Sequence, residues 1–161
     1  MSLRASSGLR GAVLEPAQES GVLSIGAESC FFLPRSLTLT SSSMTLEGLN
    51  KHTTWFTDRP ERKAGKMSTE TFFDIWNLGD DSFGKVNPNA ALVCMRGSEV
   101  IEHVVTLSRP DYSAENDDVT YDIEYVNSTG PENTETCTSE VSLFIDIITM
   151  PIPNNPLIAF N

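Results

Sequence analysis

The chain has 161 residues, of which 39% are hydrophobic and 20% are charged, as in one globular domain of ordinary size. Its formal net charge of −11 and isoelectric point near 4.5 argue against nucleic acid or an anionic membrane as the main partner, because both bind cationic surfaces. Since no apolar run approaches the ~20 residues of a membrane-spanning helix, we expect no transmembrane segment.

The acidic residues are concentrated in the last third of the chain. Residues 1–109 contain eleven Lys and Arg and twelve Asp and Glu. Residues 110–161 contain ten acidic residues and no Lys or Arg. One interpretation is solvated strand faces that keep the protein soluble. The other is a docking surface for a cation or for a partner protein with a basic surface.

Three segments are predicted from composition. Residues 1–20 are rich in Arg, Ser, Ala and Gly and are expected to form a flexible tail, with a targeting segment as the alternative. Residues 21–150 are expected to form a single β-rich domain. Residues 151–161 are expected to form a proline-rich tail outside the interior of the sheet. Each proline lacks the backbone N–H that an interior strand needs as a hydrogen-bond donor.

From residue 21 onward, short strands joined by Ser and Gly turns are the simplest interpretation. Strands are predicted at residues 22–25, 30–33, 36–40, 44–46, 90–95, 100–107, 119–125 and 141–148. In residues 119–125, Val, Tyr and Ile alternate with Thr, Asp and Glu, which predicts one apolar and one acidic face. The expected partner of this strand is residues 100–107. Residues 141–148 are apolar on both faces apart from Ser142 and Asp146, as in a central strand that is covered on both sides.

The central stretch, residues 53–89, contains both tryptophans and the one convincing helix signal. Ser68 or Thr69 is expected to cap a helix over about residues 68–78. Its apolar face is formed by Phe72, Phe73, Ile75 and Trp76, and Gly79 ends it. One helix among many strands predicts a mainly β fold, an antiparallel β-sandwich or partly open barrel, with an α+β fold as the alternative.

The charged turn before this helix is the strongest candidate binding site. Asp58, Arg59, Arg62 and Lys63 combine a carboxylate with cations that are able to bind a carboxylate or phosphate. The alternative is an ion-paired turn that merely ties the loop. An enzyme acting through Asp58 and Arg59 is the second functional hypothesis.

Two oxygen-rich loops are weaker candidates for calcium. They contain Asp80 with Asp81, and Asp117 with Asp118, but neither has the ligand spacing of an EF-hand. A calcium-dependent adhesion domain is therefore the third hypothesis. His103 shares its predicted strand face with apolar residues and is expected to be a hydrogen-bonded core histidine. The chain contains no nucleophile elbow, P-loop or dinucleotide fingerprint, and we predict no cofactor.

The three cysteines are Cys30, Cys94 and Cys137, too few for a disulfide scaffold or a zinc knuckle. At most one disulfide can form, and the odd number of cysteines favours a reducing compartment or buried thiols. Pairing of Cys137 with either Cys30 or Cys94 remains open at the level of sequence.

Several segments resemble a family of small microbial β-rich proteins, many of them exported. The segments are Trp55–Gly65 (WFTDRPERKAG), Phe73–Trp76, Asn87–Leu92 (NPNAAL) and Ser142–Asp146 (SLFID), with Met44–Leu49 as a lead-in. The resemblance implies export but no catalytic residues or substrate. Those proteins often continue into an Arg-rich tail where this chain has residues 151–161. Together these features predict a non-enzymatic β-rich binding or structural module, an accessory subunit of a larger assembly.

Overall fold

The computed structural model describes residues 22–57, 62–80, 82–126, 128–153 and 159–160. In this part of the chain, eleven strands form one antiparallel sheet and α2 (Thr69–Asp74) is the only helix. The strands are β1 (Val22–Phe32), β2 (Ser36–Leu39), β3 (Ser43–Glu47), β4 (His52–Phe56), β5 (Ala64–Ser68), β6 (Asn89–Arg96), β7 (Glu99–Ser113), β8 (Asp118–Tyr125), β9 (Glu135–Cys137), β10 (Ser139–Pro153) and β11 (Ala159–Phe160). The prediction of a mainly β fold with one short helix is confirmed.

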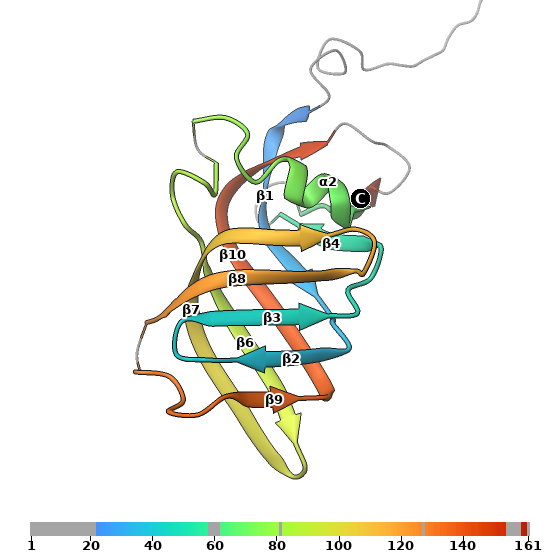
Figure 1. The fold of residues 1–161 in the computed structure, drawn as a ribbon. Coiled ribbons are helices and arrows are strands. Elements are labelled where there is room, and N and C mark those ends of the chain that lie inside the picture. Colours follow the sequence, from blue (N-terminus) through green and yellow to red (C-terminus); the bar gives the residue numbers. More distant parts are fainter. Residues whose placement is uncertain (1–21, 58–61, 81, 127, 154–158, 161) are drawn as a thin grey trace, which may run out of the picture.

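The sheet curls so that its two halves face each other. Its strand order is β11-β5-β4-β1-β10-β6-β7-β8-β3-β2-β9. In Figure 1, β8, β3, β2 and β9 lie in front of β1, β10 and β6, while α2 lies near one end of the curled sheet. A disulfide between Cys94 on β6 and Cys137 on β9 ties the last strand back to the middle of the sheet. Hydrogen bonds among the described strands therefore do not close the sheet into a barrel, but the disulfide links its last strand to its middle.

The core fills the space inside this curl. Alternate residues of the strands point inward, as in β8, where Val119, Tyr121 and Ile123 are buried. The predicted partner of β8 is confirmed, because Leu107 of β7 lies opposite Ile123. The largest fully buried side chains are Leu37, Leu39, Met44, Leu46, Met67, Phe72, Leu92, Leu107, Tyr121, Leu143 and Ile145.

Helix α2 places aromatic side chains against this core. Ser68 caps it by accepting a hydrogen bond from the Thr71 amide at 3.0 Å, as predicted. The helix is shorter than the predicted 68–78, because Ile75 has left helical geometry at φ −90° and ψ 2°. Phe72 is fully buried, and its ring lies 5.1 Å from Phe32 and 5.9 Å from Trp76.

Several strands differ from the sequence prediction. Residues 22–32 form one strand instead of two, and its register with β10 shifts twice. The strand β5 was not predicted, because AGKMS has no apolar alternation; its pairing with β4 creates it. The short strands β9 and β11 were not predicted either. In the pairing between β10 and β6 the register ends at Asp146 opposite Asn89, so Pro151 and Pro153 pair with β1 only.

The strand β10 corrects one expectation. It lies between β1 and β6, as a central strand should, but it is not covered on both sides. Leu143 and Ile145 are fully buried on the inner face, whereas Phe144 on the outer face is 43% exposed. An apolar outward residue can mark either a covered face or an unoccupied contact surface, and sequence alone does not separate the two. In the described part of the chain, no helix is long and apolar enough to cross a membrane.

Candidate functional site

The predicted anion site falls only partly within the described residues. Asp58 and Arg59 lie outside them. Arg62 is exposed and adopts a left-handed backbone at φ 51°, while Lys63 is half-buried. Thr57 organises this end of the hairpin, because its side-chain oxygen accepts the Lys63 amide at 2.9 Å and its own amide donates to the Lys63 carbonyl at 2.8 Å. The described contacts are hydrogen bonds that close the turn between β4 and β5. Binding of a carboxylate or phosphate at this site stays a prediction.

The predicted calcium ligands lie in two separate loops. Asp80 is exposed and pairs with Lys85 at 3.4 Å, whereas Asp81 lies outside the described residues. Asp117 pairs with Lys51 at 2.7 Å, and this hydrogen bond raises the pKa of the Lys51 ammonium. Neighbouring Asp118 begins β8. No group of three or more His, Cys, Asp or Glu that could hold a metal ion occurs among the described residues.

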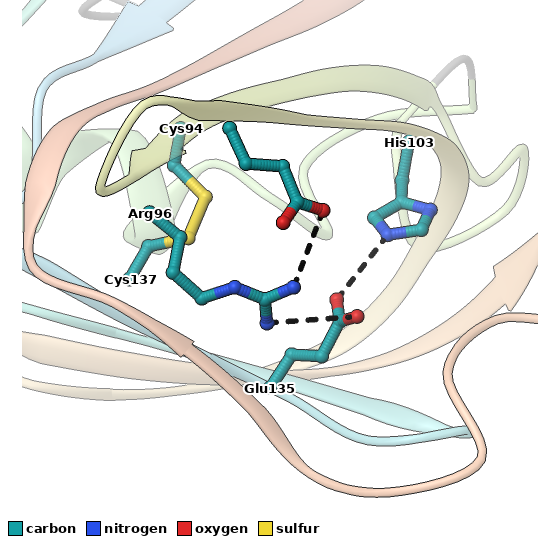
Figure 2. The surroundings of a disulfide bond; sticks show 6 residues. Cys94, Arg96, His103, Glu135 and Cys137 are labelled. Carbon is teal, nitrogen blue, oxygen red and sulfur yellow. Dashed lines mark hydrogen bonds and ion pairs between the residues drawn. A yellow bond between two sulfur atoms is a disulfide. The ribbon is translucent and has the colours of Figure 1, made fainter.

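His103 takes part in a charged cluster beside the disulfide (Figure 2). Its Nε2 lies 3.6 Å from Oε1 of Glu135, a distance for an ion pair if His103 is protonated, and too long for a hydrogen bond. Arg96 approaches the other oxygen of Glu135 at 3.9 Å and also pairs with Glu99 at 3.3 Å. His103 and Glu135 are largely buried, so residues from β6, β7 and β9 meet beside the disulfide, with Glu135 between Arg96 and His103.

His103 lies on the predicted inward face of its strand, but the hydrogen bond predicted for it is not found among the described residues, and Glu135 and Arg96 were not predicted. A sequence feature that indicates this arrangement is the spacing of two residues between each charged residue and the nearest cysteine. Arg96 follows Cys94 by two positions and Glu135 precedes Cys137 by two, so each pair shares one face of its strand. In the structure the Cys94–Cys137 disulfide joins the two strands, and Arg96 and Glu135 lie 3.9 Å apart beside it.

The acidic residues of β8 form one continuous outer surface with those of its neighbours. Residues on β8 point outward alternately, and cross-strand pairing places Glu47 of β3 opposite Asp118 and Asp111 of β7 opposite Thr120. We call this surface the acidic face. It consists of Glu47, Asp111, Asp118, Asp122 and Glu124.

One cation partly neutralises the acidic face. Arg109 donates to the carboxylate of Asp122. Among the described residues, no ion pair joins a cation to the other four carboxylates of the face. The predicted acidic side of residues 119–125 is therefore confirmed, and the fold adds Asp111 from the adjacent strand β7 and Glu47 from a distant part of the chain.

Comparison of the chain with protein-family models, with curated proteins and with solved structures finds no match.

Proposed function

We propose that the chain is a non-enzymatic binding module, which docks a partner protein with a basic surface on its acidic face. The observation that supports the proposal is the convergence of Glu47 and Asp111 on the acids of β8. Grouped exposed carboxylates create a negative potential that attracts a cationic surface and speeds its association. The disulfide supports residence in an oxidising compartment, in agreement with the exported proteins that the sequence resembles.

A variant with equal charge change tests where the partner docks. The probe is poly-L-lysine, and its affinity is measured by isothermal titration calorimetry. One triple variant neutralises the acidic face with Asp118→Asn, Asp122→Asn and Glu124→Gln. The control removes three exposed acids elsewhere with Glu70→Gln, Glu132→Gln and Glu140→Gln.

The two variants have the same net charge, so they separate a local surface from overall charge. At roughly 0.2–1 kcal/mol for each exposed pair, the face variant is expected to weaken binding by about tenfold, and the control by much less. Equal weakening by both variants would show that only net charge matters and would reject the proposed docking face.

Calcium is the rival occupant of the acidic loops and would indicate the adhesion hypothesis. A calcium site stabilises the folded state through specific binding. If the acidic residues form a docking face and not a calcium site, the melting temperatures in calcium and in magnesium are expected to agree at matched ionic strength. A calcium-specific rise of more than about 3 °C would favour the adhesion domain.

A further inference from the structure

The outer face of the sheet on β1, β10, β6 and β7 carries a row of apolar side chains. Register places Phe31 opposite Phe144, Phe144 opposite Ala91, and Ala91 opposite Val104. We call these four residues the apolar row. Because directly paired residues of antiparallel strands share a face, the row crosses four neighbouring strands.

In the row, the protruding side chain of Phe144, called the knob, lies beside a groove above Ala91. Phe144 is 43% and Val104 41% exposed, whereas Ala91 between them is too short to fill the space above it. Two hollows of about 360 Å³ and 320 Å³ both include Ala91 and Val104 in their walls. The Phe31 ring lies 4.6 Å from the Phe144 ring and supports it from the other side.

This face differs from the outer face of β8. There the outward positions are Thr, Asp and Glu, which water solvates well. On β10 and β6 the outward positions include Phe144, Ala91 and Val93, and Val93 is also 38% exposed. Contiguous exposed apolar surface of this kind marks a contact surface in soluble proteins, while scattered single residues do not.

Charged residues of opposite sign lie at the two ends of the row. At one end, Lys66 of β5 lies opposite Thr54, which in turn lies opposite Phe31. Lys66 and His52 line a hollow of about 380 Å³ there. At the other end, Glu102 of β7 is exposed near Val104. The two ends are separated by five strand spacings along the curled sheet, a path of about 24 Å at roughly 4.8 Å per strand.

We propose that this face binds a second copy of the same chain, face to face, about a two-fold axis parallel to the strands. Such an axis reverses the strand order of the partner, so the end with Lys66 faces the end with Glu102. It also sets Phe144 of each copy near the groove above Ala91 of the other, at the ~10 Å spacing of packed sheets. An axis across the strands would instead bring Lys66 against Lys66.

A second copy fits better than an unrelated partner because the face is complementary to itself in two respects. The knob at Phe144 and the groove at Ala91 are neighbours on one surface, and the basic and acidic ends lie on opposite sides of them. An isologous dimer needs this arrangement, since each patch must recognise its own copy.

Sedimentation equilibrium of the full chain tests the proposal. The wild type is expected to be a reversible dimer. Phe144→Ser removes the knob and Ala91→Glu places a charge in the groove; because both positions are exposed, the core is left intact. Each change is expected to raise the dimer dissociation constant by about tenfold or more, as loss of a central contact does. The control is Val86→Ser, which removes a 67% exposed valine from the loop before β6.

Charge reversal tests the orientation of the two copies. Lys66→Glu is expected to weaken the dimer, and adding Glu102→Lys to it is expected to restore the affinity. A wild-type protein that stays monomeric at every concentration would overturn the proposal. So would Phe144→Ser and Ala91→Glu variants that dimerise as well as the Val86→Ser control, with circular dichroism showing that all are folded. A dimer that the combined charge reversal fails to restore would overturn the orientation.

Discussion

Thr53 and Thr69 are both fully buried, and their hydroxyl oxygens lie 2.9 Å apart. Thr69 also donates to the Asn50 carbonyl at 2.6 Å, so this pair joins β4 to the start of α2. Thr69→Val keeps the shape and leaves buried groups without partners, which is expected to cost about 1–3 kcal/mol of unfolding free energy. Unfolding in urea measures this loss of unfolding free energy. The matched control is Thr45→Val at the half-buried hydroxyl pair with Thr120, and equal losses in both would contradict the assignment.

Two buried acidic groups give the stability a definite pH dependence. Burial raises the pKa of the Cys30 thiol and also raises the pKa of the Tyr121 phenol. The folded state keeps both protons, whereas the unfolded chain releases them above about pH 8.5 and pH 10 respectively. The unfolded state then binds fewer protons than the folded state, so the unfolding free energy falls as pH rises.

Unfolding in urea over the alkaline range measures this dependence. Tyr121→Phe is expected to remove the part of the fall that begins near pH 10. Its hydroxyl is buried without a hydrogen-bond partner among the described residues, so the variant is expected to be at least as stable as the wild type at neutral pH. An unchanged alkaline slope in this variant would contradict the account.

At the scale of elements, α2 belongs to the main core. Phe72 is fully buried, so Phe72→Ala is expected to lower the unfolding free energy by roughly 3–5 kcal/mol. Leu78, just after the helix, is 46% exposed, and Leu78→Ala serves as the control with a small expected effect. Similar losses in thermal melts of the two variants would show that the helix does not pack as described.

The last strand, β9, depends on its cross-link. Cys94 and Cys137 are 43 residues apart, and closing a loop of that length is expected to stabilise the fold by about 4 kcal/mol in the chain-entropy model. Guanidinium unfolding of a Cys94→Ala, Cys137→Ala variant measures the loss. Adding a reductant to the wild type should reproduce it and leave the variant unchanged. A wild type that is insensitive to reductant would contradict the cross-link.

The strands with strong alternation could be predicted from sequence because burial on one face alone determines them, as β8 illustrates. The strands β5, β9 and β11 could not be predicted, since they are short and exist through pairing with a neighbour. The same limit applies to the sites. His103 lies on the expected strand face, whereas its approach to Glu135 depends on which cysteines pair.

At the scale of the whole molecule, two surfaces of one curled sheet have opposite character. The excess of acid after Arg109 was visible in the sequence, but its grouping with Glu47 follows from the pairing of β3 with β8. The apolar row was not predicted, because residues 141–148 were expected to be covered on both sides. Both surfaces depend on cross-strand neighbours, and the pairings of β1 with β10 and of β3 with β8 join segments that are far apart in the chain.

The salt dependence of binding tests the proposed docking face most directly. The affinity for poly-L-lysine is measured over a series of sodium chloride concentrations, for the wild type and for the variant with Asp118→Asn, Asp122→Asn and Glu124→Gln. We expect the wild-type affinity to fall steeply once the Debye length drops below about 10 Å, and the variant to show a clearly shallower slope. Identical slopes for the two proteins would contradict the assignment of the acidic face as the docking surface.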